Sequence, residues 1–169
     1  MTGVSPGIVA VIKKTEDFLR EQKIEHGYII DKDGNILLKK KGTKSSVTLT
    51  ADERTKLKDN IFTHNHPGEM QQAFSMGDID TLVIDELYEM RAVTPKYNYS
   101  AKLKLPKDVS VTEFREELYK KEYAYRAFKE YELDNGIMTW KEMAPEYWHT
   151  FWKNLNNEID YFEYKRNIL

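Results

Sequence analysis

The sequence lacks cysteine altogether among its 169 residues. This absence excludes disulfide bonds, zinc ribbons held by thiolates and a cysteine nucleophile. Any zinc ion held by this chain would therefore need histidine, aspartate or glutamate as its ligands.

Long apolar runs are also missing, since none approaches the roughly 20 residues that a membrane-spanning helix requires. The N-terminus shows no signal-peptide order of basic, apolar and small residues. We therefore expect a cytoplasmic protein without a membrane partner.

A surplus of basic residues is the third absence. The chain has 26 Lys and Arg against 28 Asp and Glu, a formal charge of −2, whereas nucleic-acid-binding proteins usually show a basic excess. We expect no nucleic-acid partner. The two densest basic runs, at residues 37–42 and 102–107, are typical of exposed strand edges.

What the chain does contain predicts a folded α+β protein. Aromatic residues make up 12% of the sequence and charged residues 32%, too many aromatics for a disordered chain. Ser5 and Pro6 predict the start of a first helix. The turn at Asp33-Gly34-Asn35 predicts a β-hairpin over residues 24–42.

The middle of the chain alternates short helices and strands. Thr50 and Glu53 have capping-box spacing and predict a short helix, and a brief strand over residues 60–64 follows. Ser75 is a candidate N-cap for a helix over residues 76–90. One or two strands, interrupted near Pro95, are expected next.

The last third of the chain has a different character. Ser110 and Glu113 predict a long capped helix, and a second helical segment spans residues 139–159, with Pro145 as a break or a fresh start. Residues 161–169 stay ambiguous. Fourteen of the 21 aromatic residues lie between Phe114 and the C-terminus, which predicts either a helical lid or an arm that binds a protein partner.

The densest group of polar residues surrounds the sequence THNHP. His64 and His66 are two positions apart, so in an extended segment both imidazoles project to the same side. Asp78, in the first turn of the following helix, is a candidate third ligand. Glu25 opens the first predicted strand and could act as the general base if that strand pairs beside the histidines.

These residues together resemble the JAMM motif of the JAB/MPN metallopeptidases, over roughly residues 20–103. The resemblance implies a mixed sheet flanked by helices in an α/β/α arrangement, of the cytidine deaminase-like kind. It also implies Zn²⁺ held by His64, His66 and Asp78, water activated by Glu25, and an oxyanion stabilised by Ser75. Two features depart from the family: seven residues separate Pro67 from Ser75, one more than usual, and the helix near residue 51 is short.

The resemblance implies a hydrolase that cleaves a peptide or isopeptide bond in a protein or peptide substrate. The chain is most similar to small bacterial or phage-associated members. On this basis residues 1–108 form the metallopeptidase core, and residues 109–169 form a helical extension that packs on the core or on a partner. The alternative is a catalytically inactive JAB-like binding module that uses its aromatic C-terminal helices; a metal nuclease suggested by the letters HNH is the weakest reading.

Simpler roles exist for several of these residues. Ser75 can be only a helix cap, and Asp78 only an acid favoured by the helix dipole. Glu21 is a second acidic residue close to Glu25. His26 is expected to be a surface or packing residue and His149 a packed, hydrogen-bonded residue, so neither is expected to bind metal. The three tryptophans are expected in the core or at an interface, with a substrate platform as the minor alternative: Trp140, Trp148 and Trp152.

Overall fold

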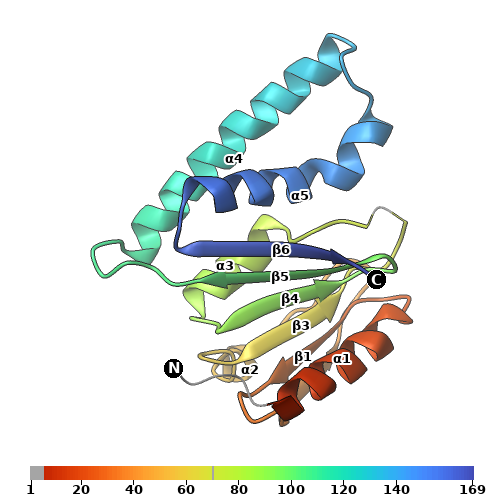
Figure 1. Cartoon of the computed structure of the whole chain (residues 1–169), viewed down its shortest axis with the longest axis vertical. Helices are drawn as coiled ribbons and strands as arrows, with labels where there is room; N and C mark the ends of the chain where they lie inside the picture. Colours follow the sequence, from red (N-terminus) through yellow and green to blue (C-terminus); the bar gives the residue numbers. More distant parts are fainter. Residues whose placement is uncertain (1–5, 70) are drawn as a thin grey trace.

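The computed structural model describes residues 6–69 and 71–169, so the predicted cap at Ser5 lies outside the described residues. Within them the chain forms five helices and six strands (Figure 1). In chain order the elements are α1 (Pro6–Arg20), β1 (His26–Ile30), β2 (Ile36–Lys41), α2 (Ala51–Arg54), β3 (Ile61–Asn65), α3 (Met76–Ile84), β4 (Glu89–Val93), β5 (Tyr97–Leu103), α4 (Val111–Asp134), α5 (Trp140–Glu158) and β6 (Phe162–Ile168).

The six strands form one sheet in the order β2-β1-β3-β4-β5-β6. Strands β3 and β4 run parallel, and every other neighbouring pair is antiparallel. The predicted α+β class with a mixed sheet is confirmed. No helix among the described residues is both long enough and apolar enough to cross a membrane.

Helices cover both faces of the sheet. On one face, Ile8 and Ile12 of α1 pack against Ile30 of β1 and Ile61 of β3. The opposite face carries the larger core, in which α3, α4 and α5 contribute side chains and Trp152 is fully buried. Successive strand residues point to opposite faces, so the two cores alternate along β1 and β3.

The predicted hairpin and capping boxes are present. Asp31 accepts hydrogen bonds from the backbone N–H groups of Asp33 and Asn35, and Gly34 has a φ of 91°, a conformation that favours glycine. Capping boxes also begin α2, α3 and α4 at the predicted residues Thr50, Ser75 and Ser110.

Two predicted boundaries were wrong. Helix α3 ends at Ile84 and not near residue 90; Leu87 and Met90 are buried beyond its end, so their apolar spacing mimicked a continuing helix. Helix α5 spans Trp140–Glu158, close to the predicted residues 139–159, but the break or fresh start expected at Pro145 is absent. The proline removes one backbone hydrogen bond, but buried residues before and after it pack against the rest of the protein and stabilise the helix.

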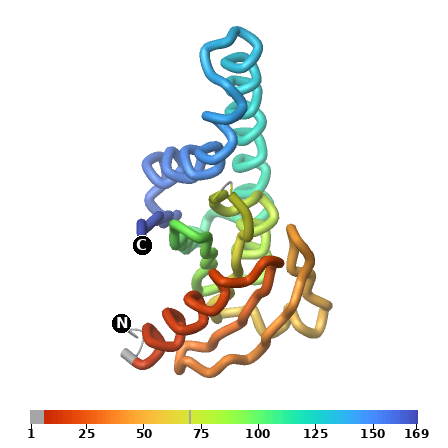
Figure 2. Tube along the Cα trace, turned by 90° about the vertical axis from the view of Figure 1, so that its right-hand side faces the viewer, coloured from red at the N-terminus to blue at the C-terminus, as the bar shows by residue number. Residues whose placement is uncertain are grey.

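The ambiguous C-terminal residues form β6, which pairs with β5 at the edge of the sheet. The segment after residue 109 therefore contributes two helices and one strand. Figure 2 shows α4 rising from the body of the molecule, with its far end and the start of α5 distant from the sheet.

Candidate metal centre

The two histidines lie at the C-terminal end of β3, where the chain leaves the sheet. His64 lies within the strand and is 2% exposed. His66 follows the strand and extends its pairing, because its backbone N–H donates to the carbonyl of Val93 at 2.9 Å. Residues two apart on an extended chain share a face. Both imidazoles therefore point to the same side, as predicted.

A glycine makes room for this arrangement. Gly27 of β1 pairs with His64, and a Cβ atom at Gly27 would lie 2.6 Å from the ring of Phe62. That ring stacks on the His64 imidazole with 5.4 Å between centroids. A larger residue at position 27 would displace the ring that supports His64.

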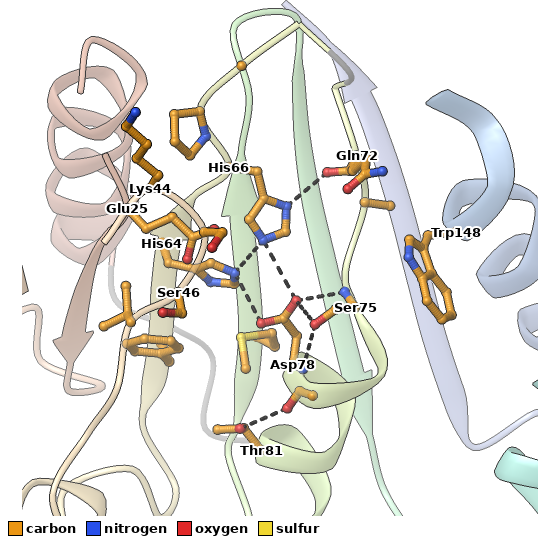
Figure 3. Close-up of a pocket in the computed structure, with 18 of the residues that line it drawn as sticks. Glu25, Lys44, Ser46, His64, His66, Gln72, Ser75, Asp78, Thr81 and Trp148 are labelled. Carbon is orange, nitrogen blue, oxygen red and sulfur yellow. Dashed lines mark hydrogen bonds and ion pairs between the residues drawn. The ribbon is translucent and has the colours of Figure 1, made fainter. Parts of the chain in front are cut away.

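The third side chain comes from the first turn of α3. Ser75 is the N-cap: Asp78 donates its backbone N–H to Ser75 Oγ at 3.2 Å. In return, Asp78 Oδ2 accepts hydrogen bonds from the Ser75 backbone N–H at 2.7 Å and from its hydroxyl at 2.8 Å. The capping box thus orients the Asp78 carboxylate toward the histidines (Figure 3).

The three predicted ligands converge. His64 Nε2 and His66 Nε2 lie 2.8 Å apart. Asp78 Oδ1 is 3.2 Å from His64 Nε2, and Asp78 Oδ2 is 3.7 Å from His66 Nε2. One ligand atom from each residue falls within 4.8 Å of the other two. Two imidazoles and one carboxylate match the three-ligand set of a catalytic zinc site.

The hydrogen bond behind His66 also fits a metal ligand. Its Nδ1 donates to the backbone carbonyl of Gln72 at 2.9 Å, so in the neutral ring Nε2 carries the lone pair that faces His64 and Asp78. His64 Nδ1 is buried without a hydrogen-bond partner among the described residues. The donor set and the tautomer of His66 therefore fit a zinc ion.

Electrostatic coupling within this group is strong. Burial alone raises the pKa of Asp78, but the adjacent His64 and His66 more than offset burial and hold that pKa well below its usual range. Burial lowers the pKa of His64, yet Asp78 raises it above its ordinary value. Burial and the neighbouring His64 lower the pKa of His66. Each of the three groups therefore shifts the pKa of the others.

Glu25 lies against this cluster, as predicted. It directly precedes β1, and because Gly27 pairs with His64, Glu25 faces the same side of the sheet as the two histidines. Its backbone donates to the Thr43 carbonyl at 2.7 Å. Burial raises the pKa of Glu25 to about 7, with His64 lowering and Asp78 raising it. A carboxyl group of this kind is suited to proton transfer near neutral pH.

The residue between the histidines was missed in the sequence. Asn65 is 2% exposed and points to the opposite face of β3. Its Oδ1 accepts the backbone N–H of His26 at 2.7 Å, and its Nδ2 donates to the Ile24 carbonyl at 2.9 Å. Asn65 therefore clamps the backbone on both sides of Glu25. Its place in a buried strand, where an amide needs partners, was the available signal.

A pocket of about 530 Å³ surrounds the cluster, and Figure 3 shows the side chains around it. Residues 44–49 form one wall, residues 66–69, 71–73 and 75 form another, and Trp148 of α5 contributes a third. A cleft with a few convergent polar groups is the usual form of a small binding or catalytic site.

Two residues of the spacer between Pro67 and Ser75 are anchored by distant parts of the chain. Tyr99 of β5 donates its hydroxyl to the Gln71 carbonyl at 2.6 Å. Trp152 of α5 donates its indole N–H to the Phe74 carbonyl at 2.7 Å. Trp152 is thus a core residue, as predicted, and the loop that carries the Gln72 carbonyl depends on the C-terminal segment.

Two other histidines and two other acidic residues lie outside the cluster. The His26 ring packs against Phe18 with 6.4 Å between the ring centroids, on the α1 side of the sheet. His149 Nδ1 lies 2.9 Å from the hydroxyl of Tyr164. Glu21 is exposed and does not line the pocket. Asp80 pairs with Arg115 of α4 at 2.7 Å. None of these four belongs to the cluster.

Comparisons with models of protein families, with curated proteins and with solved structures found no match to this chain.

Proposed function

We propose that this protein is a zinc-dependent hydrolase of a peptide or isopeptide bond, of the JAB/MPN metallopeptidase type. The observation that carries the proposal is the convergence of His64, His66 and Asp78 within 4.8 Å, in a pocket that Glu25 and Ser75 also line. Five residues from three separate segments face one cavity in the arrangement that such chemistry needs.

The donor set supports zinc, and the neighbouring groups support hydrolysis. A bound zinc ion supplies Lewis-acid polarisation of a carbonyl group and lowers the pKa of a water molecule. Glu25 accepts a proton from the attacking water as the C–O bond forms, and returns it to the leaving amine as the C–N bond breaks. The hydrogen bond from His66 Nδ1 to the Gln72 carbonyl keeps His66 in the tautomer whose Nε2 can bind the metal.

Ser75 has two parts in this proposal. In the structure its hydroxyl donates to Asp78, so it orients a ligand. It also lines the pocket, and we assign the same hydroxyl to the oxyanion side of the substrate, which requires its proton to turn away from Asp78.

Elemental analysis of the purified protein tests the metal. We expect one zinc per chain in the wild type and loss of stoichiometric zinc in His64→Ala and Asp78→Ala, since each removes one of three ligands. Two matched controls, His149→Ala and Asp80→Asn, change a histidine and an aspartate outside the cluster and should retain the metal. A wild type without zinc, or ligand variants that keep it, would contradict the proposal.

A binding or assembly module is the second candidate. It is favoured by the aromatic side chains that α4 exposes to solvent, among them Tyr123 at 69% and Tyr131 at 58%, since exposed aromatic patches often contact other proteins. A zinc-loaded wild type that hydrolyses no peptide bond in a broad peptide mixture would favour this candidate over the enzyme.

A further inference from the structure

The geometry points to a groove between α4 and α5 as a subsite for the substrate, one that selects a large apolar side chain next to a basic residue. This inference rests on the proposed hydrolase function and names the substrate class that the same site would accept.

The groove encloses about 400 Å³ and is mainly apolar. Met143 and Ala144 are buried at its base, whereas Trp140 is 63% exposed. Its apolar lining comprises Leu133, Trp140, Met143, Ala144, Tyr147 and Trp148. This cavity has the size and character that suit a large aliphatic or aromatic side chain.

The groove adjoins the pocket around the candidate metal centre. Gln72 and Trp148 line both the groove and the pocket around the zinc ligands. The backbone carbonyl of Gln72 also holds His66. Figure 3 places Gln72 and Trp148 together on one side of the pocket, opposite Glu25 and Lys44. A peptide that occupies the pocket can therefore extend across the loop into the groove.

Charged residues of α4 favour one kind of peptide residue next to this apolar side chain. Glu122 is 3.4 Å from Arg126 and accepts a hydrogen bond from the Tyr147 hydroxyl at 3.1 Å, so its charge is largely offset. Glu130 lines the same groove and makes no ion pair among the described residues. The groove thus presents one unpaired negative charge beside an apolar floor, which favours a basic residue.

Capture of a synthetic peptide library by the zinc-loaded Glu25→Gln protein tests the groove without requiring hydrolysis. The library consists of short peptides in which apolar, basic and acidic residues vary at adjacent positions. We expect captured peptides to be enriched in a large apolar residue next to lysine or arginine, as read by mass spectrometry.

Two variants in the same background test the assignment of each part. Trp140→Ala should weaken binding of the captured peptides by about tenfold or more, as loss of an aromatic side chain that the ligand covers does. Glu130→Lys should shift the preference from a basic to an acidic neighbour. Tyr123→Ala is the matched control, because it removes an exposed aromatic of α4 that lies outside the groove; it should change neither property.

Several results would overturn the inference. If Trp140→Ala and Glu130→Lys leave capture unchanged, or if Tyr123→Ala weakens capture as much as Trp140→Ala does, the groove is not the binding site. A concentration-dependent dimer abolished by Trp140→Ala would show that a second copy of the chain occupies the groove. Circular dichroism confirms that each variant is folded, and the charge reversal remains informative should Trp140→Ala be unstable.

Cleavage by the wild type separates this inference from the proposed function. Peptides captured through Trp140 and then cleaved support both. Peptides captured through Trp140 but left intact would overturn the hydrolase and, with it, the role of the groove as a substrate subsite. Cleavage without dependence on Trp140 or Glu130 would overturn the groove alone.

Discussion

The carboxylate of Glu25 lies beside the candidate zinc ligands although it comes from a different segment of the chain. Removing its charge while keeping its shape separates proton transfer from metal binding. We expect Glu25→Gln to keep one zinc per chain and to lower kcat by roughly 10²- to 10⁴-fold, the usual contribution of a general base. Zinc analysis and steady-state kinetics on a cleaved library peptide provide the two measurements.

Glu21→Gln is the control for this prediction. It makes the same chemical change at an exposed carboxylate that does not line the pocket, so activity should stay at the wild-type level. Loss of zinc in Glu25→Gln would place Glu25 among the ligands, and equal losses of activity in both variants would exclude it as the base.

Asn65 is the second residue whose role can be isolated, because it holds the backbone on both sides of Glu25. We expect Asn65→Ala to retain zinc and KM while kcat falls by about tenfold or more, since small displacements of a catalytic group are costly. In the Glu25→Gln background the same change should have little further effect, because both act on one step.

The double variant is what distinguishes positioning from general support of the fold. If Asn65→Ala lowers the residual activity of Glu25→Gln as much as it lowers that of the wild type, the two residues act independently. Asn65 would then be a structural residue only. Thermal unfolding of all four proteins reports any common loss of stability.

At the scale of the elements, two helix caps of the same chemistry have different surroundings. Ser75 begins α3 and bonds the candidate ligand Asp78, whereas Ser110 begins α4 and bonds Glu113 away from the pocket. Ser75→Ala and Ser110→Ala should each cost about 1 kcal/mol of unfolding free energy, the usual value of an N-cap. The comparison therefore subtracts the structural part of the Ser75 role.

Only Ser75→Ala should also affect the metal. We expect its zinc affinity to fall by roughly 10- to 100-fold, as is usual when a hydrogen bond to a ligand is lost, while Ser110→Ala leaves the affinity unchanged. Competition with a chelator provides the measurement. Equal affinities in the two variants would show that the Ser75 hydroxyl does not orient Asp78.

At the scale of the whole molecule, the C-terminal segment shares its core with the rest of the chain. Phe114, Phe151 and Trp152 belong to the same cluster of buried residues as Phe62 and Phe74. Removal of residues 109–169 would expose this surface and free the Phe74 carbonyl from Trp152. We therefore expect the fragment 1–108 to lose both cooperative unfolding and stoichiometric zinc.

Calorimetry and zinc analysis of the fragment test this expectation beside a full-length control. The control is the full-length variant Ile137→Ser. Ile137 lies at the tip of the α4–α5 hairpin and is 63% exposed, so the free energy of unfolding of this variant should stay within about 0.5 kcal/mol of the wild type. A fragment that unfolds cooperatively and holds zinc would instead establish residues 1–108 as an autonomous domain.

Local patterns in the sequence were sufficient for the parts of the site whose geometry is itself local. The two-residue spacing of His64 and His66 places them on one face of any extended strand, and the Ser75-x-x-Asp78 spacing is a capping box whatever surrounds it. The Asp33-Gly34-Asn35 turn predicted the hairpin for the same reason. Helix ends were less certain, because apolar residues such as Leu87 and Met90 continue a helical spacing beyond Ile84.

Contacts between distant segments had no such local signal. The prediction that Glu25 lies near the histidines depended on the assumption that its strand pairs with theirs. In the structure β1 does pair with β3. The clamp by Asn65, the anchoring of Phe74 by Trp152 and the groove lined by Trp148 all join residues that are far apart along the chain. Local propensities specify which residues share a face, whereas burial of a common core decides which faces meet.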